Sequence, residues 1–309
     1  MNQERRLSTR ARVQSLGLML AGALVPLAIA PGNAAAQDGV EPVNFRRPIT
    51  LIAGGLDSRT SDEPENTDVI MLARVDVPNQ TVRAVSIPRD LFLEIPGYGF
   101  DKITRAYDFG SKADGGSFKA GASLMRDTIA GNFGIEMDGV VLTTFDGFMQ
   151  IVDALGGVDV DNPYDVYDAE YPTRDYGYKE IYYPAGWNHL SGEQALEFAR
   201  TRHQDGDGGR VMRQQLVLRA LLDRARDPEI APTLPDIMVE NLSAVRTDLG
   251  PSKRLALALA APSLSNDSVV FSSLDGMVYP DSTSSGMWIY SGDWSQIPGY
   301  VDGFLSGAF

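Results

Sequence analysis

Residues 69–87 read Val69-Ile-Met-Leu-Ala-Arg-Val-Asp76, Val77-Pro-Asn-Gln80 and Thr81-Val-Arg-Ala-Val-Ser-Ile87. Two runs of β-branched and aliphatic residues, Val69–Asp76 and Val82–Ile87, flank a Pro-Asn turn, a pattern typical of a β-hairpin. A third run, Ile49–Gly54, precedes them. We expect these three strands to form the core of a sheet.

Helical periodicity alternates with these strands and continues after them. The third of four helical segments is preceded by Ser191 with Gln194 three residues on, which predicts a capping box. Alternating strands and helices predict a single α/β domain. The four segments are Phe118–Phe133, Phe145–Leu155, Gly192–Ala199 and Gly208–Arg226.

The rest of the chain has weaker patterns. Residues 160–185 are rich in tyrosine, Asp and Pro and predict an irregular excursion or a long hairpin. From about residue 229 we expect a C-terminal extension of the same domain, with a helix near Ser252–Ala261 and a strand near Val269–Phe271.

The N-terminus has the three parts of an export signal. A basic stretch precedes an apolar run from Leu16 to Ala30, and small residues at 34–36 end it. The run is shorter than the roughly twenty residues of a spanning helix, which favours cleavage over a retained anchor. We therefore expect a signal peptide over 1–36, a linker over 37–45, a catalytic domain over 46–309, and an exported protein of the cell envelope or surroundings.

Composition excludes several classes of function. A formal net charge of −14 argues against a nucleic-acid partner. The absence of cysteine excludes thiol catalysis and thiolate metal sites, and two histidines, His189 and His203, exclude a multi-histidine zinc site. Any metal is therefore expected to be held by oxygen.

Four arginines lie between residues 200 and 213 of this acidic chain. Guanidinium groups bind phosphate oxygens two at a time, so the cluster predicts a phosphate or diphosphate ligand. Simple pairing with local acids, Asp205 and Asp207, is the alternative. The expected ligand-facing side chains are Arg200, Arg202, Arg210, Arg213 and Gln214, the last three sharing a helix face.

Two carboxylates flank the first two strands. Asp57 follows the first and Asp68 precedes the second, so pairing of these strands would bring both to one end of the sheet. Mg²⁺ is the metal ion expected to bind there, because it takes one or two carboxylates and completes its coordination shell with water and phosphate oxygens. Acids that simply flank a turn are the alternative explanation.

Two more cations follow the third strand. Pro88 ends that strand, so Arg89 emerges at its rim, and Lys102 lies a short way on. Both could contact the same ligand, although Arg89 could instead pair with Asp90 or Asp101. Ser86 with His203 as its base is conceivable, but nothing in the sequence orients that pair.

Together these motifs resemble the LytR-CpsA-Psr family of cell-envelope phosphotransferases. The resemblance runs from about Ile49 to Arg226, and Thr104 departs from it, since asparagine is usual there. The elements that carry it are Gly55–Arg59, Thr67–Leu72, Ser86–Asp90, Lys102-Ile103, Leu155–Asp159, Gly192–Leu196, Ala199–Arg202 and Asp207–Gln214.

The resemblance implies a mixed sheet flanked by helices and a specific reaction. A glycopolymer is moved from a polyprenyl diphosphate carrier to peptidoglycan, with Mg²⁺ on the diphosphate and polyprenyl phosphate released. Contact with the membrane surface would come through the lipid substrate. By resemblance Asp57 and Asp68 match metal ligands, and the diphosphate contacts are matched by Arg89, Arg200, Arg202, Arg210 and Gln214, with Asp207 beside them.

The residues present agree with the reaction that the resemblance implies. Phosphoryl transfer needs a protein to position groups and to stabilise negative charge, and arginines with Mg²⁺ do both. We expect Asp57 or Asp68 to help deprotonate the attacking hydroxyl. Phe148, Ile151 and Leu155 could line a slot for the lipid, although core packing explains them equally simply.

Two other functions fit the sequence. A pyrophosphatase would use the same cluster with water as acceptor, and a non-catalytic module would bind lipid-linked glycans without turnover. Two acids beside a phosphate site argue against pure anion binding. A glycan-binding scaffold that uses the tyrosine-rich residues 160–185 is a weaker third reading.

Overall fold

The computed structural model describes residues 47–57, 66–173, 177–260, 264, 268–274 and 276–309. The expected signal segment, 1–36, and linker, 37–45, lie outside these ranges. Among the described helices, none combines the length and apolar character that crossing a bilayer requires.

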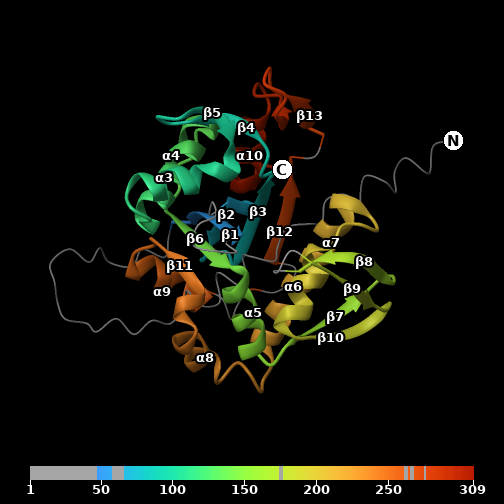
Figure 1. Ribbon diagram of the computed structural model, residues 1–309. Helices are drawn as coiled ribbons and strands as arrows, with labels where there is room; N and C mark the ends of the chain where they lie inside the picture. Colours follow the sequence, from blue (N-terminus) through green and yellow to red (C-terminus); the bar gives the residue numbers. More distant parts are fainter. Residues whose placement is uncertain (1–46, 58–65, 174–176, 261–263, 265–267, 275) are drawn as a thin grey trace.

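A six-stranded mixed sheet forms the centre of the molecule (Figure 1). The three predicted strands are confirmed, and each pairs antiparallel with the next in sequence. Two further strands lie parallel to them, one beside β1 and one beside β3, and β11 closes one edge. In sheet order the strands are β11 (Val245–Thr247), β6 (Gly139–Thr144), β1 (Ile49–Asp57), β2 (Asn66–Asp76), β3 (Thr81–Ile87) and β12 (Val269–Ser273).

Both faces of the sheet are buried, because side chains alternate along each strand. In β1, Leu51 and Ala53 pack into one core, and Ile52 and Leu56 into the other. The second core is covered by α3 (Ala106–Ala113), α4 (Phe118–Phe133) and α10 (Ile297–Ser306) (Figure 1). The first is covered by α5 (Phe145–Ala154), α6 (Gly192–Arg200), α7 (Gly206–Arg226), α8 (Leu234–Glu240) and α9 (Pro251–Ala260).

The helix predictions are confirmed with small changes at the ends. α4 has the predicted bounds, and Gly134 ends it in a left-handed conformation, φ 71°, which glycine adopts at little cost. The capping box at the start of α6 is present, with Ser191 and Gln194 each bonded to the other's backbone. α7 begins two residues earlier than expected, at Gly206.

Short two-stranded ribbons decorate this core, and the sequence indicated only one of them. The tyrosine-rich segment is a long hairpin, as one of the two expectations had it. The ribbons are β4 (Phe92–Ile95) with β5 (Gly99–Lys102), β7 (Val158–Asn162) with β10 (Gly186–Leu190), β8 (Val166–Pro172) with β9 (Tyr178–Tyr183), and β13 (Val278–Ser282) with β14 (Trp288–Gly292).

Candidate functional site

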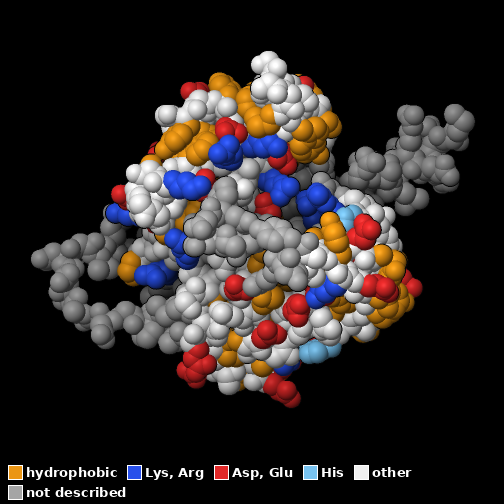
Figure 2. Space-filling view, viewed as in Figure 1, with side chains coloured by type: hydrophobic (Ala, Val, Ile, Leu, Met, Phe, Trp, Pro, Cys, Tyr) orange, Lys and Arg blue, Asp and Glu red, His pale blue; other side chains and the backbone are white. Residues whose placement is uncertain are grey.

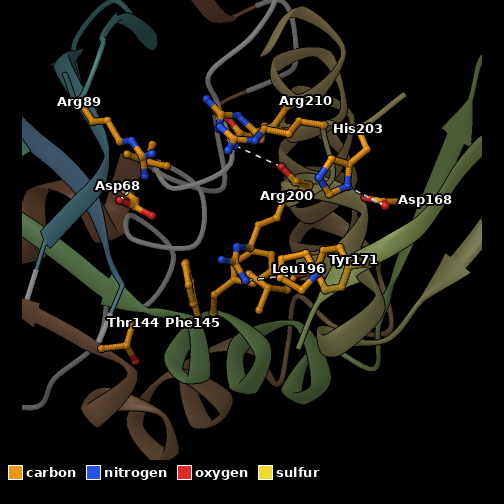
Figure 3. Close-up of a pocket in the computed structure, with 16 residues that line it drawn as sticks. Asp68, Arg89, Thr144, Phe145, Asp168, Tyr171, Leu196, Arg200, His203 and Arg210 are labelled. Carbon is orange, nitrogen blue, oxygen red and sulfur yellow. Dashed lines mark hydrogen bonds and ion pairs between the residues drawn. The ribbon is translucent and has the colours of Figure 1, made fainter. Parts of the chain in front are cut away.

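A cavity of about 270 Å³ lies between the sheet and the helices α5, α6 and α7, with β8 as a further wall (Figure 3). Arg89 and Arg200, predicted from two distant stretches, line the same cavity. Its polar lining is Asp68, Arg89, Thr144, Asp168, Tyr171, Arg200, Arg202, His203, Arg210 and Gln214, and its apolar lining is Val69, Phe145, Phe148, Pro172, Leu196 and Ala199.

Asp68 reaches the cavity because β2 contains a β-bulge. Gly55 of β1 pairs with Val69, but the next residue, Leu56, pairs with Thr67, which leaves Asp68 as the extra residue on β2. A bulge re-aims the side chain at its centre and often lies beside a functional site. The bulge therefore points the Asp68 carboxylate at the cavity, which the next residue, Val69, also lines.

Arg89 is held by the acids of the sheet side. Its Nη1 donates to Asp68 Oδ1 at 2.7 Å and its Nε to Asp90 Oδ2 at 3.4 Å. Burial lowers the pKa of Arg89, but the adjacent Asp68 and Asp90 outweigh burial and raise it. Arg89 therefore stays a cation while sharing its charge with two carboxylates.

Lys102 does not line the cavity, contrary to the expectation of a direct ligand contact. Its Nζ lies 2.7 Å from Asp90 Oδ1 and 5.7 Å from the centre of the Trp288 ring. Asp90 thus bridges Lys102 and Arg89, which leaves Lys102 separated from the cavity by Asp90 and Arg89.

Thr104, the departure from the family pattern, fastens the backbone next to the bulge. Its Oγ1 donates to the Thr67 carbonyl at 2.9 Å, and Thr67 Oγ1 donates back to the Thr104 carbonyl at 3.1 Å. Both hydroxyls are buried, so threonine here fixes the residue that precedes Asp68.

The opposite wall carries the arginines of α6, α7 and the turn between them (Figure 3). The Arg200 guanidinium lies 4.2 Å from the centre of the Phe145 ring, and its Nη1 donates to the Tyr171 hydroxyl at 3.4 Å. Arg202 is exposed at the cavity rim. Figure 2 shows Lys and Arg gathered in a band across the middle of this face, although the chain as a whole is acidic.

The prediction that Arg213 faces the ligand is wrong. Its side chain is fully buried and does not line the cavity. It donates to the carbonyls of Phe198 and Thr201 and makes a two-pronged ion pair with Asp205, with Nη1 to Oδ2 at 2.6 Å. Arg213 therefore ties α7 to the end of α6 and fixes the turn that presents Arg202 and His203.

A second network anchors α6 to the β8–β9 ribbon. The Tyr183 hydroxyl donates to the buried Glu197 carboxylate at 2.6 Å, and Lys179 pairs with the same carboxylate. Hydrogen bonds to Glu197 and Glu193 raise the pKa of Lys179 to about 12. These contacts hold the helix that carries Arg200 against the ribbon that carries Asp168.

Asp168 and His203 form a pair that the sequence analysis missed. The Asp168 side chain is 1% exposed and accepts hydrogen bonds from Thr201 Oγ1 at 2.5 Å, His203 Nδ1 at 2.8 Å and the Glu170 amide at 3.0 Å. Burial alone would raise the pKa of Asp168, but these donors outweigh it and lower the pKa. An acid at an inward position of the alternating β8 pattern was the available signal.

Of the three residues predicted to line a slot for the lipid, one lines the cavity and two do not. Phe148 lines the cavity. So do Phe145 and Leu196, which lie away from Arg89 and Arg210 (Figure 3). Ile151 and Leu155 do not line it and are core residues, 3% and 1% exposed. Because the Arg200 guanidinium lies over Phe145, the apolar side chains of the cavity lie directly beside one of its cations.

The remaining predicted residues are less fully described. The Asp57 backbone pairs with Asn66, two residues before Asp68, but its side chain and that of Asp207 lie outside the described part. Ser86 pairs with Met71 and Ser273 inside the sheet and does not line the cavity, so it is not the partner of His203. Among described residues no group of three or more Asp, Glu or His side chains gathers as a metal cage.

Comparison with known sequences finds the same family that the sequence motifs resemble. The family model described as the LytR_cpsA_psr family matches residues 31–299. The polyisoprenyl-teichoic acid–peptidoglycan teichoic acid transferases TagU of Bacillus mycoides and TagV of Bacillus subtilis are each 31% identical to this chain over 218 residues. Each match covers 69% of this chain, but only 65% of that TagU and 52% of that TagV, so the chain spans about half to two thirds of these relatives.

Solved structures share the fold. The crystal structure of B. subtilis TagV superposes with a TM-score of 0.66 and 25% identity, covering 84% of this chain and 98% of that one. The structure of TagT bound to LI-WTA has a TM-score of 0.62 and 23% identity, covering 90% and 99%. The mixed sheet with helices on both faces is therefore the architecture of these proteins too.

Proposed function

The chain belongs to the LytR-CpsA-Psr family, and from that premise we propose that it transfers a glycopolymer from a polyprenyl diphosphate carrier to peptidoglycan or a related wall acceptor. The reaction forms a phosphodiester between glycan and acceptor and releases polyprenyl phosphate. The names of TagU and TagV, teichoic acid transferases that act on a polyisoprenyl-linked substrate, support this assignment.

The observation that carries the proposal is the meeting of Arg89 with Arg200, Arg202 and Arg210 in one cavity. A diphosphate spreads its negative charge over several oxygens, and preorganised guanidinium groups stabilise such charge most effectively in a site that excludes water. We propose that these four arginines and Gln214 hold the diphosphate. Phe148, Phe145 and Leu196 would contact the first part of the lipid, whose remainder reaches the membrane surface.

We also propose Mg²⁺ as cofactor, held by Asp57 and Asp68. The donor set fits: the Asp57 backbone pairs with β2 beside the bulge, and Asp68 lines the cavity. Two carboxylates leave the rest of the magnesium shell to water and phosphate oxygens. When bound, the metal would neutralise charge on the transferring phosphate.

The arginines contribute to the reaction by positioning the substrate. The arginines hold the leaving polyprenyl phosphate while the acceptor hydroxyl attacks the phosphorus that bears the glycan. Asp207, on the first turn of α7, stays a predicted member of the site. Export to the cell envelope, through the signal segment predicted at 1–36, would place the protein beside both substrates.

A product analysis tests the proposal. The full chain is incubated with Mg²⁺ and a synthetic polyprenyl-diphosphate glycan, with and without peptidoglycan fragments. Ligase activity predicts a glycan–peptidoglycan phosphodiester that forms only with acceptor and is lost on adding a chelator or in Asp68→Asn. Free glycan phosphate would instead identify a pyrophosphatase, and tight binding without turnover a non-catalytic module; either result would overturn the proposal.

A further inference from the structure

The two histidines of the chain make the same contact in different surroundings. His189 Nδ1 and His203 Nδ1 each lie 2.8 Å from an aspartate oxygen, of Asp159 and Asp168 respectively. Asp159 is 60% exposed on β7, whereas the Asp168 side chain is 1% exposed in the cavity wall. Only the second pair is built into the site (Figure 3).

Asp168 fixes both the orientation and the tautomer of His203. A buried aspartate that accepts three hydrogen bonds and has a lowered pKa is an acceptor only. His203 Nδ1 must therefore donate, so in the neutral ring Nε2 carries the lone pair. Within the described ranges Nε2 makes no hydrogen bond, and the ring lines the cavity.

Two carboxylates were expected to act as base: the side chain of Asp57 lies outside the described part, and Asp68 is engaged elsewhere. Asp68 accepts from Arg89 at 2.7 Å and is also the proposed metal ligand. The charged groups that share the cavity with His203 are Asp168 of β8, Arg200 at the end of α6, Arg202 in the turn and Arg210 of α7, with Asp68 and Arg89 across it. The arginines supply cations for the phosphates, but none of them can accept a proton at neutral pH.

We propose that His203, oriented by Asp168, is the general base of the transfer reaction, an inference that rests on the proposed function. The acceptor O–H gives its proton to His203 Nε2 as its oxygen forms the new bond to the glycan-bearing phosphorus. The bond from that phosphorus to the bridging oxygen breaks, and polyprenyl phosphate leaves with the electron pair. Histidine suits this role because its side chain titrates near neutral pH.

Kinetics of three variants of the full chain test the inference. His203→Gln keeps a polar group beside Asp168 but cannot accept the proton, so we expect kcat to fall by about 10²- to 10⁴-fold with KM for the lipid substrate changed little. The acidic limb of the wild-type pH–rate profile should disappear. Asp168→Asn should lower kcat in the same direction, while His189→Gln, the matched control, should behave as wild type.

The outcomes separate the two proposals. An inactive wild-type chain would overturn the proposed function and the role of His203 with it. An active wild type with a His203→Gln variant that keeps most of its kcat, or loses activity only through KM, would overturn the inference alone.

A second measurement does not depend on turnover. With ¹⁵N-labelled histidine the chain should give two sets of ring signals, assigned through His189→Gln. We expect the neutral His203 ring to be protonated at Nδ1, and addition of Mg²⁺ with inorganic pyrophosphate to shift its signals but not those of His189. A ring protonated at Nε2, or one that does not respond to pyrophosphate, would contradict the assignment.

Discussion

The cavity has two walls that differ in how their charged side chains are paired. The sheet wall contains Asp68 and Arg89, and the helix wall contains Arg200, Arg202, His203 and Arg210. On the sheet wall cations and acids alternate: Lys102 meets Asp90, Asp90 meets Arg89, and Arg89 meets Asp68. On the helix wall two described acids already have partners, Asp168 with His203 and Thr201, and Asp205 with Arg213.

The arginines of the helix wall complete the contrast. Within the described ranges neither Arg200 nor Arg202 lies within ion-pair distance of a carboxylate. The described charges of the sheet wall are paired with one another, whereas the helix wall keeps positive charge that can serve the proposed ligand. Substitutions on the helix wall should therefore have larger effects than those on the sheet wall.

The largest effect is expected from Arg213→Ala, which removes the support of the helix wall. Truncation leaves Asp205 without its cationic partner and two carbonyls without the guanidinium donor, so the free energy of unfolding should fall by about 3–5 kcal/mol. Denaturant unfolding measures this. Arg213→Lys should recover only part of the loss, because an ammonium cannot make the forked contact; full stability in Arg213→Ala would show that the wall does not depend on this residue.

Arg202→Ala tests the ligand-facing charge of the same wall. Loss of one preorganised donor to a developing anion should lower kcat by about 10²- to 10³-fold. The free energy of unfolding should stay within about 0.5 kcal/mol of the wild-type value, because the side chain is exposed. Arg219→Ala, on α7 outside the cavity, is the control. Equal losses in the two variants would show that the effect is one of general charge.

Asp168→Asn tests the buried acid through the pH dependence of stability. The pKa of Asp168 is lower in the folded chain than the value near 3.9 of an unfolded one, so its contribution is complete above that value and is lost as pH falls through the folded pKa. The variant should be less stable by about 1.5–3 kcal/mol at pH 7, with the difference shrinking below about pH 4. Thermal unfolding of both proteins at several pH values measures this difference. A difference that stays constant with pH would contradict an ionised Asp168.

The smallest effect is expected from Lys102→Met on the sheet wall. Its ion pair with Asp90 is partly solvated, and such pairs contribute about 0.2–1 kcal/mol. Because Lys102 does not line the cavity and reaches Arg89 through Asp90, we expect at most a few-fold rise in KM for the lipid substrate. A loss as large as that of Arg202→Ala would mean that the two walls do not differ as proposed.

Much of the fold could be predicted from the sequence where burial follows a regular period. The strands β1, β2 and β3 have two buried faces, and α4 and α6 have clear caps, so local pattern and tertiary structure agree there. Ribbons such as β13–β14 are exposed along most of one strand. Without an alternating pattern of burial, the sequence contains no signal for them.

The site was predictable where it depends on charge and not where it depends on register. Arg200 and Arg202 stand out because guanidinium groups are concentrated between residues 200 and 213 of an acidic chain, and Arg89 because Pro88 ends the strand before it. Arg210 and Arg213 share a helix face by spacing, but the approach of α6 turns Arg213 into the interior. Asp168 required knowing which face of β8 points inward, and its contacts with Thr201 and His203 after α6 decide that.

The lining of the cavity runs in sequence from Asp68 on β2 to Gln214 on α7, so no short piece of the chain holds a complete binding site. A bound diphosphate would act as a non-covalent cross-link between the sheet and the paired helices. By mass action, a ligand at 100 times its Kd should stabilise the folded state by about 2.7 kcal/mol. A rise in melting temperature with pyrophosphate would therefore report occupancy of the cavity before any acceptor sugar is known.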